Sequence, residues 1–237
     1  MLALASFAAH TDAKTDALMQ AAEHNNTAKA RRLIAAGADV NAKGNEDWTV
    51  LMWAAWCNSP EVAKLLLESG ADVNAKNSNG NTVLMFTTWK DSADVAELLL
   101  AAGAGANARD DNDGFVLAYA AANNSADVAR LLLTAGADVN ATDEYGKTAL
   151  MFAADYDSAD AAEILLATGA DVNAKDNDGM TALMYAALFN SADIAKVLLA
   201  VGANLNVKDN RGWTARRLAD RHETPDVAEL LEAAGAR

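Results

Sequence analysis

The sequence has one cysteine, Cys57, and only two prolines among 237 residues. A lone cysteine excludes an internal disulfide framework and a multi-cysteine metal site, so the fold must be held together by packing. Cys57 itself is interpreted as structural or incidental. No stretch approaches the roughly 18 unbroken apolar residues of a membrane-spanning helix, so no membrane span is expected.

Basic residues are also scarce. Nineteen Lys and Arg face 33 Asp and Glu, which gives a formal net charge of −14. This charge repels phosphate backbones and anionic membrane surfaces, so nucleic acid is excluded as an expected partner. Basic proteins or cations are the partners that the charge favours.

The first 11 residues lack the basic segment and the length of a complete export signal. Residues 2–9, Leu-Ala-Leu-Ala-Ser-Phe-Ala-Ala, nevertheless resemble the end of a signal-peptide apolar region. Two interpretations stay open: residues 1–11 are a remnant of an export signal, or they form an extra helical turn over the first repeat. The export interpretation favours a periplasmic or secreted protein over a cytoplasmic one.

What the sequence does contain is a repeat. Near copies of Ala-Gly-Ala-Asp-Val-Asn-Ala return every 33 residues, with their glycines at Gly37, Gly70, Gly103, Gly136, Gly169, Gly202 and Gly235. Glycine adopts positive φ without a Cβ clash, so each copy is interpreted as the end of a helix. Seven such ends in register predict a single elongated stack rather than one or two ordinary domains.

One repeat shows the expected unit. Residues 148–156 place Leu150, Ala153 and Ala154 at helical spacing, and Thr148 is expected to cap that helix. A second helix is expected from residue 159 to about 168, with Ser158 as its cap and Gly169 at its end. Residues 171–179 are rich in turn formers and predict a hairpin-like loop.

The same pattern holds along the chain. First helices are expected to begin near Asp16, Thr49, Thr82, Phe115, Thr148, Thr181 and Thr214, and second helices to follow Asn26, Ser59, Ser92, Ser125, Ser158, Ser191 and Thr224. Each pair is too short to fold alone and must stack on its neighbours. Arginines in the first and last units, such as Arg31 and Arg216, mark these units as caps with one face in water.

The period, the Thr-x-Leu-x-x-Ala-Ala helix start (Thr49, Leu51, Ala54, Ala55) and the Leu-Leu-x-x-Gly-Ala-Asp-Val-Asn-Ala close (residues 132–141) resemble the ankyrin repeat. The resemblance implies an all-α solenoid of seven helix-turn-helix units with hairpin-like loops, over residues 12–237 as one domain. The units are expected to end near residues 41, 74, 107, 140, 173, 206 and 237. The family role that it implies is binding of other proteins through a concave face.

The sequence departs from the usual Thr-Pro-Leu-His of the family. Methionines take the histidine position at Met52, Met85, Met151 and Met184, so the family's loop hydrogen bonds cannot be carried over. Aromatic residues occupy the next position, at Trp53, Phe86, Tyr119, Phe152 and Tyr185. We interpret this aromatic column as packing between repeats rather than as a platform for a cofactor.

The resemblance places two sets of residues on the concave groove: the pair after each Ala-Ala, and residues at the loop tips. The candidate partner-binding residues are Trp48, Trp56, Cys57, Asn81, Trp89, Lys90, Ala122, Asn123, Tyr145, Asp155, Tyr156, Met180, Leu188, Phe189 and Trp213. Trp48, Trp56 and Trp89 form the leading patch, because Trp is enriched among interface hot spots. The alternative is that each Trp only covers the end of a neighbouring helix.

A second candidate patch, formed by Glu144, Tyr145, Asp155 and Tyr156, is more acidic and suits a basic or hydroxyl-bearing partner. A third feature is the irregular segment from Gly103 to Tyr119. There Gly-Ala replaces Asp-Val, the loop glycine moves to Gly114 and Phe115 replaces the capping Thr. Thr87-Thr88 replaces Ala-Ala just before it. This segment is either a hinge, a partner contact or simple drift.

Catalysis is not expected. His10, His24 and His222 lie far apart in an elongated stack, and none can sit beside Cys57 as a thiol nucleophile requires. No glycine-rich phosphate loop follows a strand, and the Asp-Asn-Asp-Gly loops lack the spacing of a calcium loop. No catalytic, cofactor or metal site is assigned.

The sequence therefore predicts a non-catalytic, monomeric interaction module, acting as an inhibitor or a protective subunit. The alternatives are a small-molecule or cation-binding protein that uses the aromatic and acidic groove, an architectural protein that self-associates, and an engineered ankyrin binder. Cys57 and the irregular fourth repeat favour a natural bacterial sequence over an engineered one.

Overall fold

The computed structural model describes residues 13–236. Within this range the chain folds into thirteen α-helices and two 3-10 helices, with no strand, which confirms the all-α prediction. The helices group into two compact units, Met1–Asn112 and Asp113–Arg237. The predicted export remnant or extra turn at residues 1–11 lies outside the described residues. The prediction of one domain over residues 12–237 stays a prediction.

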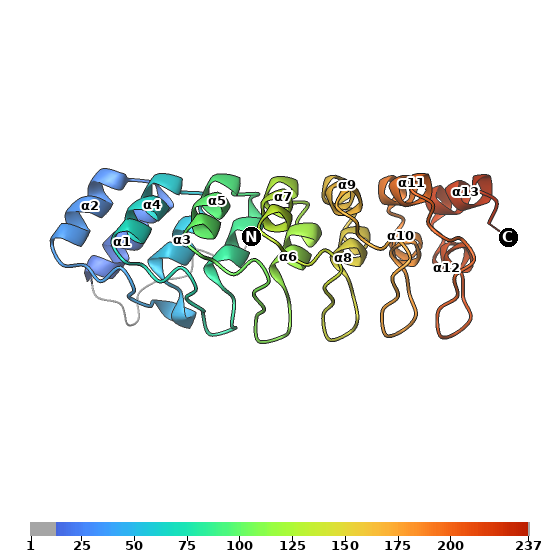
Figure 1. Cartoon of the computed structure of the whole chain (residues 1–237), viewed down its shortest axis with the longest axis horizontal. Coiled ribbons are helices and arrows are strands. Elements are labelled where there is room, and N and C mark those ends of the chain that lie inside the picture. The colour runs from blue at the N-terminus through green and yellow to red at the C-terminus, as the bar shows by residue number, and fades with distance from the viewer. Residues whose placement is uncertain (1–12, 237) are drawn as a thin grey trace. The chain divides into compact units, whose positions relative to one another are not determined.

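The first unit holds two rows of helices. Figure 1 shows α2, α4 and α5 in one row, with α1 and α3 beside them. The elements are α1 (Ala13–Glu23), α2 (Thr27–Ala35), the 3-10 helix η1 (Asn45–Asp47), α3 (Val50–Trp56), α4 (Pro60–Glu68), the 3-10 helix η2 (Val83–Trp89) and α5 (Ala93–Ala101).

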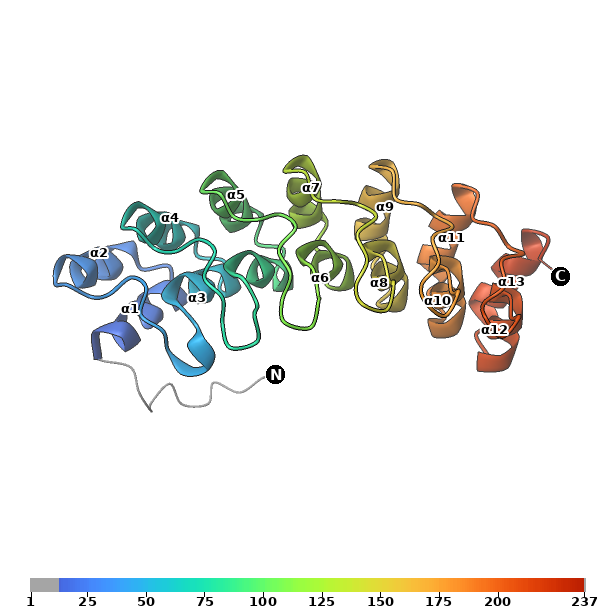
Figure 2. The ribbon, with the colours of Figure 1, turned by 60° about the horizontal axis from the view of Figure 1, so that its bottom comes forward.

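The second unit repeats this arrangement. In Figure 2, α6, α8, α10 and α12 follow one another, and α7, α9, α11 and α13 form the neighbouring row. The elements are α6 (Val116–Ala122), α7 (Ala126–Thr134), α8 (Ala149–Asp155), α9 (Ala159–Ala167), α10 (Ala182–Phe189), α11 (Ala192–Ala200), α12 (Ala215–His222) and α13 (Pro225–Ala233).

The cores follow the predicted stripe. Leu51, Leu117 and Leu150 are buried, and the Ala-Ala pairs of α3, α6, α8 and α10 have no exposed surface. Alanine has no side chain beyond Cβ, so helices of successive repeats can approach closely at these pairs. The outer faces remain polar in the predicted cap units, where Arg31, Arg32 and Arg217 are exposed.

The helix starts are confirmed except at the first repeat, where α1 begins at Ala13 rather than near Asp16. Thr148 caps α8 as predicted, because its hydroxyl accepts a hydrogen bond from the Met151 N–H at 3.4 Å. The Met151 sulfur in turn accepts one from the Thr148 N–H at 3.5 Å. Thr49 and Met52 form the same pair in α3. The methionine therefore occupies the third helical position as a weak reciprocal acceptor.

Ser158 occupies the N-cap position of α9 as predicted, but its side chain does not bond the N–H groups of that helix. Its hydroxyl instead donates to the Ala122 carbonyl of the preceding repeat at 3.3 Å. Ser191 donates in the same way to Ala154 at 3.0 Å, and Thr224 to Ala187 at 2.7 Å. Because the last carbonyls of a helix have no partner within it, these hydroxyls join neighbouring repeats by satisfying them.

The recurring motif ends helices as predicted. Its seven glycines have positive φ, between 82° and 98°. Its asparagine, which carried no prediction, joins consecutive repeats: the Asn140 side chain accepts from the Asp171 N–H at 2.8 Å and donates to the Gly169 carbonyl at 3.5 Å. The motif aspartate Asp171 accepts from the Asn173 N–H at 2.9 Å and so shapes the turn.

Two irregularities correct the predictions made from the sequence. The first helix of the third repeat, η2, is a 3-10 helix rather than an α-helix. In the irregular segment, the left-handed loop position that Gly80 and Gly146 occupy elsewhere is held by Asp113, with φ 62°, and not by Gly114. Aspartate tolerates this conformation better than most residues. The hinge and partner-contact interpretations of this segment stay predictions.

Candidate partner-binding surface

The hairpin loops are shaped by a buried or half-buried acceptor at their base. In the fifth repeat, Asp143 Oδ1 accepts from the N–H groups of Tyr145 (3.0 Å) and Lys147 (2.8 Å). Asp176 and Asp209 do the same in the next two loops, and Asn77 does so in the third repeat. These loop-base acceptors therefore serve the fold rather than a ligand.

Neighbouring loops are also bonded to each other. The Asn177 N–H donates to the Tyr145 carbonyl, and the Asn210 N–H to the Asp178 carbonyl, both at 2.9 Å. In the first unit, the Ser78 N–H donates to the Glu46 carbonyl at 2.9 Å. Bonding of one loop to the next holds the side chains at the loop tips in register with the helices behind them.

Five aromatic side chains of the first unit meet and are called the aromatic cluster: Trp48, Trp53, Trp56, Phe86 and Trp89. The Trp48 ring lies 4.2 Å from Phe86, 5.5 Å from Trp53 and 6.0 Å from Trp56, between ring centroids. Trp89 lies 5.3 Å from Trp56 and 5.6 Å from Phe86. The structure therefore brings the three residues of the leading predicted patch together, and adds Trp53 and Phe86 from the aromatic column.

The five rings of the aromatic cluster differ in how exposed they are. Phe86 is 2% exposed, whereas Trp89 is 38% exposed. Trp48, Trp53 and Trp56 are half-buried. A half-open group of large rings on a buried base has the geometry of an interface anchor, because the rings offer area without needing to be ordered on binding.

Three other predicted contact residues belong to the repeats that carry the aromatic cluster. Lys90 is exposed, and Cys57 is half-buried. Burial raises the pKa of the Cys57 thiol, while the nearby Lys90 charge opposes that rise. Asn81 is half-buried and its Oδ1 has no hydrogen-bond partner. The assignment of Cys57, Asn81 and Lys90 to a partner contact stays a prediction.

In the second unit a lysine takes the position of Trp48. Lys147 stands three repeats after Trp48, and its ammonium lies 4.5 Å from the Phe152 ring centroid and 4.4 Å from that of Tyr185. Its Nζ is 2.6 Å from Asp155 Oδ2. Phe152, Asp155 and Tyr185 occupy the positions of Trp53, Trp56 and Phe86. One position between two rings of the aromatic column therefore accepts either an indole or a paired cation.

Tyr185 extends this network. Its hydroxyl donates to Asp176 Oδ2 at 2.7 Å, while Asp176 Oδ1 holds the loop. Burial is the main cause that raises the pKa of Tyr185 far above its usual value, and the hydrogen bond and charge of Asp176 add to it. Tyr185 therefore stays neutral and serves as a donor to the loop.

The second predicted patch is only partly available. The Asp155 carboxylate forms an ion pair with Lys147, so it is not available to a partner. Tyr145 and Tyr156 are 63% and 62% exposed, and Glu144 is exposed as well. Phe189, in the position of Tyr156 one repeat later, is 51% exposed, and Leu188 beside it is half-buried. These exposed rings and Glu144 form the second candidate surface.

Four further predicted residues differ in how the structure places them. The expectation that Met180 is offered at a loop tip is wrong, because it is 8% exposed and its N–H is bonded to Asp176. Trp213 is half-buried beneath two guanidinium groups, 4.7 Å from Arg217 and 5.4 Å from Arg221. Asn123 is exposed and Ala122 half-buried at the end of α6.

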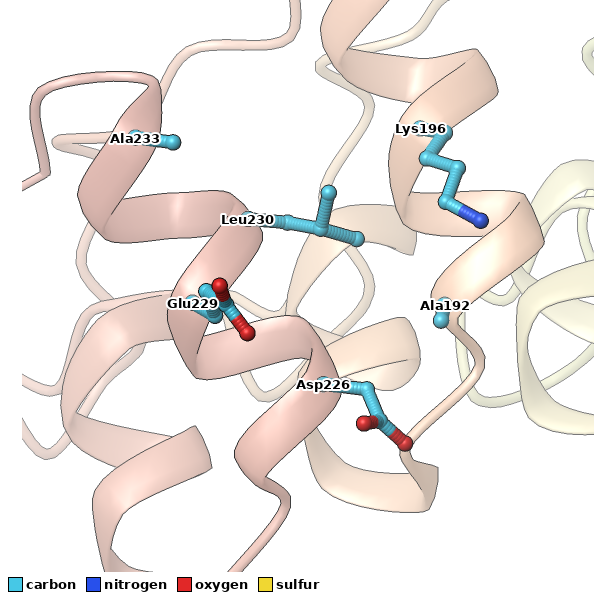
Figure 3. A pocket seen from close by; sticks show the side chains of 6 residues that line it. All are labelled: Ala192, Lys196, Asp226, Glu229, Leu230 and Ala233. Carbon is cyan, nitrogen blue, oxygen red and sulfur yellow. The ribbon is translucent and has the colours of Figure 1, made fainter.

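A further groove of the second unit lies elsewhere. Figure 3 shows it between α11 and α13, lined by Ala192, Lys196, Asp226, Glu229, Leu230 and Ala233, with a volume of about 440 Å³. Lys196 is bonded to Asp193 at 2.8 Å, and Asp226 accepts from Asn190 at 2.8 Å. Two of its charged groups thus already serve the fold.

Within residues 13–236, no group of three or more His, Cys, Asp or Glu side chains is arranged to hold a metal ion. In the same part of the chain, no helix is long and apolar enough to cross a membrane. Sequence reasoning missed Lys147 and the Tyr185–Asp176 pair. The 33-residue register could have identified Lys147, because it aligns Lys147 with Trp48. The predicted loop-tip residue of that repeat, Tyr145, lies two positions before the aligned one.

Comparisons with known proteins agree with this architecture. A family model described as ankyrin repeats in three copies matches residues 2–77, 84–176, 117–209 and 169–237, and one described as ankyrin repeats in many copies matches residues 58–100. No curated protein matches the chain. The crystal structure of the human ASB11 ankyrin repeat domain is similar, with a TM-score of 0.84 at 26% identity, over 93% of this chain and 98% of that one.

Proposed function

We propose that this chain, which belongs to the ankyrin repeat family of generally protein-binding modules, holds a partner protein against its aromatic cluster. The observation that carries the proposal is the continuous contact of four tryptophans and Phe86, with Trp89 38% exposed at the edge. Stacking of repeats does not require tryptophan at these positions, since the equivalent pair in α6 is Ala122 and Asn123.

Of the three tryptophans in the leading predicted patch, Trp56 and Trp89 are better placed than Trp48 to contact a partner. Trp56 and Trp89 follow the Ala-Ala positions at the helix ends, and Trp89 is the most exposed ring. Trp48 meets Trp53, Trp56 and Phe86 in the position that Lys147 fills in the second unit. We assign Trp48 mainly to packing, and Trp56 and Trp89 to the partner.

The second candidate surface suits a basic partner segment. Tyr145, Tyr156 and Phe189 are exposed rings, and the exposed carboxylates Glu144 and Asp157 accompany them. Because Lys147 is neutralised by Asp155, it does not offset these negative charges. Binding at this surface is expected to weaken as salt rises, since exposed charges are screened.

The small-molecule alternative has weaker support. No metal-holding acidic or histidine group occurs in the described residues, and the groove of Figure 3 has charged groups already bonded within the fold. We also propose that the chain acts as an inhibitor or a protective subunit. This role requires that the captured partner is an enzyme and that its activity falls when it is bound.

The proposal is tested by affinity capture from the source organism with the full chain and with Trp56→Ala/Trp89→Ala. We expect specific partners to be lost from the double variant, with a dissociation constant at least about 30-fold weaker, because truncation of even one hot-spot tryptophan costs about 2 kcal/mol or more. Far-UV circular dichroism should show an unchanged helical signal.

Val201→Ala is the control, because it removes an exposed apolar side chain outside both candidate surfaces. It should capture the same proteins as the parent chain. Retention of all partners by the double variant would contradict the proposal.

A further inference from the structure

Three buried polar atoms without hydrogen-bond partners occur in the described part of the chain, and all belong to the third repeat: Asn81 Oδ1, Thr82 Oγ1 and Ser92 Oγ. Several equivalent hydroxyls in other repeats are bonded. The hydroxyls of Thr49 and Thr148 accept from a helix N–H, and that of Ser191 donates to the preceding repeat. Buried groups without partners are rare and costly, so three in one repeat indicate local strain.

The same repeat contains η2. It runs for seven residues, Val83–Trp89, whereas 3-10 helices longer than three or four residues are uncommon. In the other six repeats the first helix is an α-helix. The unpartnered atoms therefore flank the altered helix within one repeat.

The sequence difference that explains η2 is the pair Thr87-Thr88. Both residues are fully buried, where the other internal repeats have Ala-Ala. Thr87 Oγ1 donates to the Leu84 carbonyl at 2.7 Å, and Thr88 Oγ1 to the Met85 carbonyl at 2.9 Å. Each bond reaches back three residues, and the branched side chains add bulk at a close-packed site.

The helix type sets the geometry of the aromatic cluster. A 3-10 helix has three residues per turn, so side chains three apart eclipse each other. Phe86 and Trp89 are three apart in η2 and are stacked, at 5.6 Å and 24° between planes. Trp53 and Trp56 are also three apart, in the α-helix α3, but each of them meets Trp48 edge-on.

We infer that Thr87 and Thr88 are positioning residues, which hold η2 in the 3-10 form so that Phe86 supports Trp89 at the open edge of the cluster. The arrangement lowers the stability of the third repeat and fixes the most exposed ring. The purpose of this arrangement rests on the proposed function, but its conformational claim does not.

The test is Thr87→Ala/Thr88→Ala in the full chain. The variant should relax η2 to an α-helix and restore partners to Thr82 and Ser92. We expect the melting temperature to rise by about 3–6 °C. The near-ultraviolet circular dichroism of the stacked rings should change, and Trp89→Phe assigns the band that belongs to Trp89.

Thr168→Ala is the matched control, because Thr168 also bonds a helix carbonyl but lies at the end of α9. It should leave the near-ultraviolet spectrum unchanged. A double variant whose spectrum is unchanged, or whose melting temperature does not rise, would overturn the inference. Both measurements are made without a partner, so a failure of the partner-capture experiment does not affect them.

Discussion

Trp48 and Lys147 share a register position but have opposite chemistry. Each side chain lies between a ring of its own repeat and the corresponding ring of the next. A flat indole fills this position by packing, and an ammonium fills it by cation–π contact and an ion pair with Asp155. The repeat therefore fixes the shape of the position without fixing its charge.

Lys147→Met tests this interpretation. Both charged side chains are largely buried, so removal of the cation leaves the Asp155 carboxylate unpaired. We expect the free energy of unfolding to fall by about 1–3 kcal/mol, measured by chemical denaturation. Lys147→Met/Asp155→Leu should recover most of the loss, because Trp48 shows that the position accepts an apolar group. Equal stability of the single and double variants would argue against the ion pair.

Tyr185 predicts a dependence on alkaline pH. Its pKa is raised in the folded protein, so above the unfolded pKa of about 10 the native state keeps a proton that the unfolded state releases. The stabilisation that neutral Tyr185 contributes should therefore be fully present below that pH and should fall as the pH rises above it. Tyrosinate absorbance of the parent and Tyr185→Phe should show that Tyr185 ionises only on unfolding. A variant with an identical titration curve and identical alkaline unfolding would refute this.

At the scale of the element, helix ends and starts were predictable because they depend on local chemistry. Glycine at a helix end and threonine at a helix start act within a few residues, and the structure confirms both. The function of Ser158 was not predictable in the same way. Its hydroxyl bonds a carbonyl 36 residues earlier, and no local pattern reveals that contact.

The candidate site was predictable in part for a related reason. Family position identified Trp56 and Trp89, and the structure brings their rings together. The pairing of Asp155 depends on Lys147, eight residues earlier. Met180 is buried although it follows a loop rich in turn formers. The 3-10 form of η2 depends on how two buried threonines find hydrogen-bond partners, which residue preferences alone do not decide.

At the scale of the molecule, each compact unit carries its own candidate surface. The first unit has the aromatic cluster, and the second has the exposed rings of Tyr145, Tyr156 and Phe189. The net charge of −14 favours basic partners for either surface, through faster association and rejection of anionic competitors.

The central claim is that a partner protein contacts the aromatic cluster, and site-specific photo-crosslinking tests it most directly. Trp89 is replaced in the full chain by benzoylphenylalanine, with Val201, an exposed apolar residue outside both surfaces, replaced in the matched control. We predict that the label at position 89 forms a covalent adduct with the captured partner and that the label at position 201 does not. An adduct at position 201 with none at position 89 would contradict the claim.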